Sequence, residues 1–367
     1  MIETLRETMT AEPQASLAIG GLLIGALFGA LVQRTNFCTM GSVSDIVNFG
    51  DWRRFRAWLL ACAVAITGTQ VLAFAGVVPL EKSMYLGASL NWLGHILGGL
   101  MLGFGMVFAG GCPSKTVARV GGGDLRSLVT LMVIGIAGFM AGGGVLGPSR
   151  AALEAATRVD LAGIAPSQGL GDILAAQTGI TRASAGLGAG VAIAVLIALY
   201  VFASRAFRSS PVHVLSGIGI GLLIIAGWAV TGLAYDELAD TPTNPISLTF
   251  VRPAGDTLDW LQRFTALGWP GFGVTTVFGA IFGAFVAATA AGQFRLATFS
   301  DPADMVRNLM GAVLMGVGGM LALGCTVGQG ITGVSTLAVG SFLTFAGIVA
   351  GGVLGLKAFE RMLLAEA

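Results

Sequence analysis

The sequence is dominated by apolar stretches of about 20 residues, each long enough to cross the hydrocarbon core of a bilayer. Only 11% of the residues are charged, and the mean hydropathy is +0.84. A soluble domain carries about 25% charged residues, so we predict an all-α polytopic membrane protein. Nine spans are expected, at residues 16–32, 57–78, 92–110, 125–146, 183–203, 212–233, 272–291, 305–323 and 339–357.

The segments between these spans differ in length. Residues 40–49 are too short and too polar to span, and we expect a re-entrant segment there. Residues 148–182 are interpreted as an extramembrane loop with one surface helix, and residues 234–268 as a second long loop containing three prolines. The acidic N-terminus precedes a first apolar run without a small-residue cleavage site, which indicates a retained helix rather than a signal peptide.

Charge and residue usage exclude several classes of function. The formal net charge of +1 gives no electrostatic basis for binding nucleic acid. The four cysteines form no CxxC and only two histidines are present, so neither a disulfide framework, a metal site nor a cofactor is indicated. His95 and His213 lie at helix starts and are interpreted as interface residues. The sequence PSKT at 113–116 lacks the glycine spacing of a phosphate-binding loop, which argues against an ATPase.

The distribution of basic residues predicts the orientation. With the N-terminus outside and the C-terminus inside, 13 of the 20 Lys and Arg residues fall in inner segments. An excess of Lys and Arg on the cytoplasmic side is the rule for membrane proteins. Both long loops, 148–182 and 234–268, are then expected outside.

Two broken helices, each with a cysteine at the break, are the most informative motif. GFGMVFAGGCPSKTVARVGGG begins at residue 103, and a second copy, GVGGMLALGCTVGQGITGVST, begins 213 residues later. The matched positions are Gly103, Gly105, Ala109, Gly111 and Cys112 in the first copy and Gly316, Gly318, Ala322, Gly324 and Cys325 in the second.

A second match suggests that the chain contains two related halves. GALFGALV at 25–32 corresponds to GAIFGAFV at 279–286. We predict one membrane domain over 1–367, with repeats at about 16–147 and 270–357 joined by linking helices and loops at 148–269. The spans that end at the two cysteines cross in opposite directions, which is the pattern of an inverted repeat. Such repeats place a substrate near the midplane, between broken helices.

The chemistry of these breaks favours a small anion. A restarting half-helix points free N–H groups and partial positive charge into the path. Donors follow both cysteines, and Gly111 and Gly324 permit the breaks; the supporting residues are Gly111, Lys115, Thr116, Gly324, Thr326 and Gln329. Cys38 marks a third candidate break. Because thiols are soft, weak donors, a row of them favours a soft, sulfur-bearing substrate.

Other interpretations of the same residues remain open. Cys62 lies inside an ordinary apolar helix and is expected to be a filler of that helix. Lys115 and Arg119 are equally well explained as topology charges at the inner surface. A membrane thiol oxidoreductase would require a CxxC or another cysteine pair, and a copper(I) transporter would require paired Met and Cys, neither of which the spacing provides.

The elements FCTMG around Cys38, GGCPS around Cys112 and GCTVGQGITG around Cys325 resemble the YeeE/YedE family of bacterial sulfur-compound transporters. The resemblance implies nine membrane helices with short intramembrane helices, an hourglass-like inverted repeat, and uptake of thiosulfate across the inner membrane rather than an enzymatic activity.

The resemblance also implies roles for particular residues and a partner. Cys325 would receive the anion from outside, Cys112 would hold it, and Cys38 would assist its exit, with weak thiol hydrogen bonds passing it along. Members often work with a TusA-like cytoplasmic sulfur-carrier protein. Because some relatives handle selenium or other sulfur compounds, the exact substrate does not follow from the family.

Overall fold

The computed structural model describes residues 2–238 and 243–366, and this part of the chain is almost entirely helical. The helices of the first third are α1 (Ile2–Ala11), α2 (Pro13–Thr35), α3 (Thr39–Phe49), α4 (Arg53–Phe74), η1 (Leu80–Lys82), α5 (Trp92–Phe108), α6 (Pro113–Gly121) and α7 (Leu125–Gly142). Two short strands, β1 (Ser89–Asn91) and β2 (Arg158–Asp160), pair in an antiparallel manner.

The remaining helices extend from residue 147 to residue 366. They are α8 (Gly147–Thr157), α9 (Leu170–Thr178), α10 (Arg182–Phe202), α11 (Arg205–Arg208), α12 (Pro211–Leu233), α13 (Val251–Leu267), α14 (Phe272–Ala290), α15 (Pro302–Leu321), the π-helical segment η2 (Gly328–Gly333) and α16 (Val339–Glu366).

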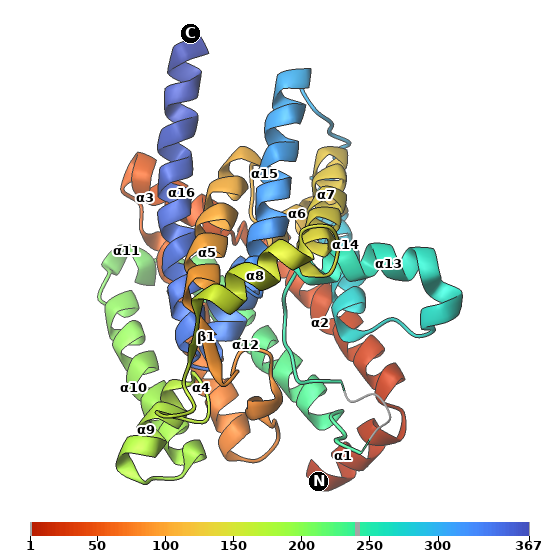
Figure 1. Cartoon of the computed structure of the whole chain (residues 1–367). Helices are drawn as coiled ribbons and strands as arrows, with labels where there is room; N and C mark the ends of the chain where they lie inside the picture. Colours follow the sequence, from red (N-terminus) through yellow and green to blue (C-terminus); the bar gives the residue numbers. More distant parts are fainter. Residues whose placement is uncertain (1, 239–242, 367) are drawn as a thin grey trace.

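The predicted class of fold, an all-α polytopic membrane protein, is confirmed. Within the described residues, eight helical stretches are long and apolar enough to cross a bilayer, and they match eight of the predicted spans. The remaining span, predicted at 305–323, forms α15. It is less apolar because Asp304, Arg307 and Asn308 lie in its first two turns. The start of α1 and the end of α16 lie at opposite ends of the molecule (Figure 1), as an odd number of crossings requires.

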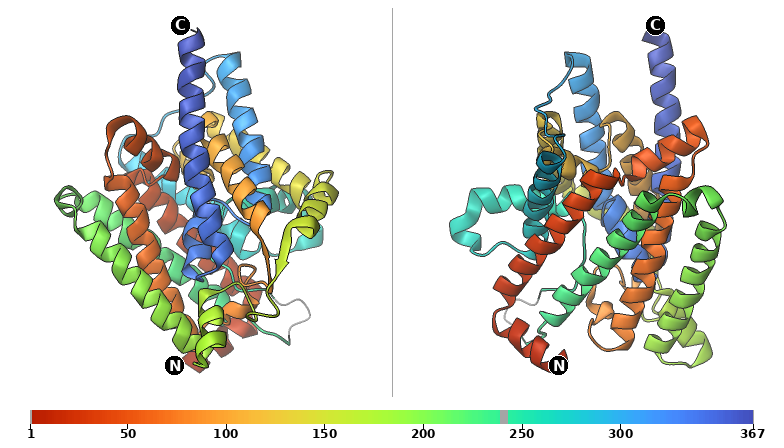
Figure 2. Two further views of the ribbon diagram at one scale, coloured as in Figure 1. Left: turned by 60° about the vertical axis from the view of Figure 1, so that its left-hand side comes forward. Right: turned by 180° about the vertical axis from the view of Figure 1, so that it is seen from behind.

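Helices α15 and α16 project beyond the rest of the molecule at the end that carries the C-terminus, as the additional views show (Figure 2). Helix α16 has 28 residues and is therefore about 42 Å long at 1.5 Å per residue. A hydrocarbon core is about 30 Å thick. The last turns of α16 therefore extend past the apolar layer.

Glycines let the central helices approach closely. A Cβ added at Gly29 of α2 would lie 1.9 Å from the Ala280 carbonyl oxygen of α14, and one at Gly283 would lie 1.8 Å from the Ala26 carbonyl oxygen. Both glycines belong to the matched GALFGALV and GAIFGAFV stretches. Such small-residue contacts allow helices to pack backbone to backbone in a membrane.

The crossing of α5 and α15 has an internal symmetry. A Cβ at Gly98 would meet the Gly318 carbonyl oxygen at 2.5 Å, and one at Gly105 would meet that of Gly311 at 2.6 Å. The 213-residue offset between the two cysteine motifs maps Gly98 onto Gly311 and Gly105 onto Gly318. The same four glycines therefore make both contacts, which agrees with a two-fold relation between these helices.

Two of the expected loops contain more structure than predicted. The prediction of a long loop at 234–268 is wrong for its second half, where α13 forms; residues 239–242, including Pro242, lie outside the described residues. Charged residues on one face of α13 interrupt the apolar pattern, and Pro253 sits in its first turn, where proline is tolerated. The segment 148–182 holds two helices, α8 and α9, rather than one.

Candidate functional site

Three helix breaks share one backbone geometry. A residue in the left-handed conformation lies two positions before each of the three cysteines predicted to line the path: Asn36 (φ 53°), Gly110 (φ 74°) and Leu323 (φ 60°). The carbonyl of each cysteine then accepts the first hydrogen bond of a new helix, from Ser42 to Cys38 (3.0 Å), from Thr116 to Cys112 (2.9 Å) and from Gln329 to Cys325 (2.8 Å). Each cysteine therefore stands at the N-terminal end of a restarting helix.

This position brings backbone N–H groups to the thiol. The sulfur of Cys325 accepts a hydrogen bond from the Gly328 N–H at 3.3 Å, and the Thr249 hydroxyl lies 3.8 Å from the same sulfur. The first N–H groups of a helix have no partner within the helix and carry partial positive charge. The break at Cys325 therefore combines a soft sulfur with a local environment that favours anions.

The fold brings Cys38 and Cys112 together. Their sulfur atoms are 3.6 Å apart, and the Ser114 hydroxyl lies 3.3 Å from the Cys112 sulfur. Both side chains are buried. The sequence contains no CxxC, and we expected no cysteine pair. That expectation is wrong, because the fold brings Cys38 and Cys112 into contact although they are 74 residues apart. Cys325 contacts other groups, so the thiols form an adjacent pair and a separate single site.

The fourth cysteine, Cys62, contacts η2, the helix after Cys325, and the sequence did not predict this contact. The Cys62 thiol donates to the Gly330 carbonyl in η2 at 3.3 Å. Trp58, one turn earlier on α4, lies against Gly330, and its indole N–H donates to the Thr39 hydroxyl at 3.1 Å. The i, i+4 spacing of Trp58 and Cys62 places both on one helix face, which is the one signal that could have indicated their role.

Two cationic side chains hold the breaks near the paired thiols. The Lys115 ammonium group donates to the Asn36 side-chain oxygen at 2.9 Å, and the Arg119 guanidinium donates to the Gly110 carbonyl at 2.7 Å. Each thus bonds to a residue in the left-handed conformation. Lys115 is buried. Its hydrogen bond to Asn36 joins the break at Cys112 to the break at Cys38, and its positive charge lies in the same region as these two thiols.

The other predicted supporting residues lie at the breaks, with different surroundings. The amide of Gln329 is fully engaged: its nitrogen donates to the Ala322 carbonyl at 2.5 Å and its oxygen accepts from Ser341 at 2.6 Å. Thr116 donates to the Cys112 carbonyl at 3.1 Å. The Thr326 hydroxyl is fully buried and has no hydrogen-bond partner in the described part of the chain.

Of the two glycines named as supporting residues, Gly324 leaves little room for a side chain, whereas Gly111 has only ordinary contacts around it. A Cβ at Gly111 would approach the Arg119 guanidinium to 3.4 Å, and one at Gly324 would approach the Gln329 side chain to 3.1 Å. His95 is buried and bonds to Thr344 of α16 at 2.8 Å, so it joins two helices as an interface residue.

Helix breaks buried inside a multi-pass bundle, each followed by a restarting helix, are typical of membrane transporters. The chain belongs to the family described as Sulphur transport, which matches residues 34–354. This membership confirms the resemblance to the YeeE/YedE transporters and supports a transporter over an enzyme.

Named relatives align with most of the chain. It is 27% identical over 339 residues to the thiosulfate transporter TsuA of Spirochaeta thermophila, covering 88% of this chain and 93% of the relative. It is also 27% identical over 341 residues to the thiosulfate transporter TsuA of Escherichia coli, covering 86% and 87%. A shorter match, 31% identical over 118 residues, joins 32% of this chain to 27% of the probable transporter YedE of Escherichia coli.

Proposed function

We propose that this protein takes up thiosulfate, or a closely related sulfur anion, across the bacterial inner membrane along a path lined by Cys325, Cys112 and Cys38. The observation that carries the proposal is the common geometry of the three breaks, each of which sets a thiol at the N-terminal end of a restarting helix. The two relatives named as thiosulfate transporters, which align over nearly the whole chain, support this choice of substrate.

The chemistry of the path follows from these contacts. Thiosulfate carries two negative charges and a soft terminal sulfur, so helix N-termini offset its charge while thiols donate weak hydrogen bonds to it. Weak contacts allow release to the next site. Cys325 receives the anion, Cys112 holds it, and Cys38, whose sulfur is 3.6 Å from that of Cys112, accepts it for exit.

We further propose that the N-terminus lies outside and the C-terminus inside. The excess of Lys and Arg in the corresponding inner segments supports this orientation. Under it, the projecting ends of α15 and α16 face the cytoplasm, where a TusA-like sulfur-carrier protein would receive the anion.

The test is uptake of radiolabelled thiosulfate by cells that lack their own route. Replacing Cys112 with Ala removes one hydrogen-bond step, and a loss of about 1.4 kcal/mol of stabilisation corresponds to a tenfold lower rate. We therefore expect the Cys112→Ala variant to lose about nine-tenths of the uptake. The Ser216→Ala variant is the control, because it removes a buried donor that bonds within α12, to the His213 carbonyl, outside the three breaks.

The outcomes separate the alternatives. Full uptake by a well-expressed Cys112→Ala variant would remove the cysteine path from the proposal. An absence of thiosulfate uptake by the parent would refute thiosulfate and direct attention to other sulfur or selenium compounds.

The contact between Cys38 and Cys112 favours a thiol oxidoreductase as the second candidate. A free-thiol titration that falls by two during turnover would support that candidate against simple transport.

A further inference from the structure

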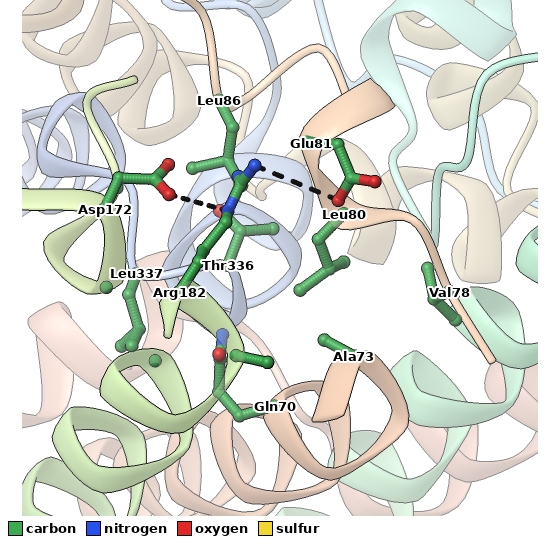
Figure 3. Close-up of a pocket in the computed structure, with 14 residues that line it drawn as sticks. Gln70, Ala73, Val78, Leu80, Glu81, Leu86, Asp172, Arg182, Thr336 and Leu337 are labelled. Carbon is green, nitrogen blue, oxygen red and sulfur yellow. Dashed lines mark ion pairs between the residues drawn. The ribbon is translucent and has the colours of Figure 1, made fainter. Parts of the chain in front are cut away.

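A small cavity of about 80 Å³ is lined by elements that lie toward the end of the molecule carrying the N-terminus (Figure 1). Figure 3 shows its charged side chains. It is bounded by α4, η1, the start of α9, the start of α10 and the segment that follows η2, and it is partly open to solvent. The residues that matter for its chemistry are Gln70, Glu81, Asp172, Arg182, Thr336 and Leu337. By the same measure a single water molecule needs about 10–15 Å³, so the cavity has room for one small tetrahedral anion.

Arg182 is the cationic group of this cavity, and its two ion pairs are unequal. Its Nε lies 2.6 Å from Asp172, whose side chain is only 3% exposed and also accepts a hydrogen bond from Ser167. Its Nη1 lies 3.9 Å from Glu81, whose side chain is 49% exposed (Figure 3). Its Nη2 is buried and has no hydrogen-bond partner among the described residues. Asp172 therefore fixes the guanidinium, while Glu81 is loosely held.

Part of the cavity lining, Thr336 and Leu337, belongs to the segment that follows η2, the helix after Cys325. Thr336 donates to the carbonyl of Gly333, the last residue of η2, at 2.7 Å, and Gln70 donates to the Ser335 carbonyl at 2.9 Å. Leu337 is buried in the left-handed conformation (φ 62°). Non-glycine residues in this conformation are strained and persist where the surrounding structure holds them. A ligand in this cavity therefore touches the segment that runs back to the cysteine.

We propose that this cavity is an anion-receiving site ahead of the cysteine path, where Arg182 binds a small tetrahedral sulfur anion and Glu81 competes with that anion for the guanidinium. The guanidinium of an arginine suits such an anion, and Nη1, which makes only the long contact with Glu81, is the atom available to it. With Glu81 in place, the three charged side chains sum to −1, which opposes entry. When Glu81 turns to solvent, Arg182 and Asp172 alone form a neutral pair and the anion can bind.

This inference rests on the proposed uptake of a sulfur anion and predicts opposite effects of two substitutions. Glu81→Gln removes the competitor, so we expect the KM for thiosulfate uptake to fall by about threefold or more. Arg182→Gln removes the anion contact, so we expect KM to rise by about tenfold or more, with partial recovery in Arg182→Lys, which keeps the charge.

The adjacent ion pair of Lys82 and Glu237, 2.5 Å apart on the same side, supplies matched controls. Glu237→Gln and Lys82→Gln remove the same charges close to the cavity without lining it, and we expect KM to stay within about twofold of the parent. Equal effects of Glu81→Gln and Glu237→Gln, or of Arg182→Gln and Lys82→Gln, would overturn the proposal, because general surface charge would then explain both.

A binding measurement separates this site from the transport function. Thiosulfate, and sulfate as a second probe, should raise the thermal unfolding temperature of the purified parent and of Cys112→Ala, but not that of Arg182→Gln. If the parent takes up no thiosulfate yet shows this Arg182-dependent shift, the receiving site stands and the proposed function fails. If neither anion shifts the parent, or if the shift survives in both Arg182→Gln and Arg182→Lys, the receiving site is refuted.

Discussion

The hydroxyl of Thr326 provides a sharp test of the path because stability and transport should respond in opposite directions. Thr326 follows Cys325 directly, is fully buried and has no hydrogen-bond partner in the described part of the chain. We interpret this hydroxyl as a donor kept free for the anion. Thr332, the fifth residue of η2, is equally buried, but its hydroxyl donates to the Leu248 carbonyl at 2.7 Å. Valine has nearly the shape of threonine without the hydroxyl.

The expected magnitudes follow from the different partners. Leaving a buried polar group without a hydrogen bond costs about 1–3 kcal/mol. Thr326→Val removes such a group and should stabilise the protein by about 1–2 kcal/mol. Thr332→Val instead removes the donor from the Leu248 carbonyl and should destabilise it by about 1–2 kcal/mol. The two variants should therefore differ by about 2–4 kcal/mol although the chemical change is identical.

The assay combines equilibrium unfolding in mixed detergent micelles with thiosulfate uptake. We expect Thr326→Val to be more stable than the parent and to transport about tenfold more slowly, because one donor to the anion is lost. A Thr326→Val variant that is less stable than the parent would show that the hydroxyl has a structural partner. A stable variant with unchanged uptake would show that the hydroxyl does not contact the anion. Either result refutes the reasoning.

Two further predictions concern packing and the ties between breaks. Gly283→Val would place a Cβ 1.8 Å from the Ala26 carbonyl oxygen, so we expect the free energy of unfolding to fall by about 3 kcal/mol or more. Gly188→Val is the control and should change this free energy little. A Cβ added at Gly188 would have no neighbouring side chain or packed helix of the described residues within 4 Å. Lys115→Met removes the hydrogen bond to the Asn36 side chain. We therefore expect about tenfold slower thiosulfate uptake and slower oxidative cross-linking of Cys38 to Cys112. Unchanged rates in both assays would contradict the view that Lys115 holds the two breaks together.

The membrane spans could be predicted because the information for them is local. The bilayer sets the length of each apolar stretch, and the stretch itself supplies the residues. Helix α13 was not predicted because its sequence is not a continuous apolar stretch. Its charged residues form two i, i+4 ion pairs on the helix surface, Arg252–Asp256 and Arg263–Asp259, and these interrupt the apolar run. A pattern based on bilayer length does not detect an amphipathic helix with so many charges.

The arrangement of the site could be predicted only in part. Glycine-cysteine motifs indicated where helices break, but the contact between Cys38 and Cys112 joins residues 74 positions apart and depends on how α2 packs against α6. The receiving cavity likewise combines Glu81, Asp172 and Arg182 from three separate segments. No local spacing encodes such contacts, because they arise from packing between elements that are distant in sequence.

The three breaks indicate which part of the site is the common requirement. Asparagine, glycine and leucine adopt the same left-handed conformation at Asn36, Gly110 and Leu323, although for leucine this costs about 1–2 kcal/mol. The backbone geometry is therefore shared while the residue type is not. A left-handed residue ends one helix and lets the chain extend through the cysteine before the next helix begins. Among the described residues Leu323 lacks a cationic tie like those at the other two breaks; there the neutral Gln329 side chain donates to the carbonyl of the preceding residue, Ala322, and holds the third break in place.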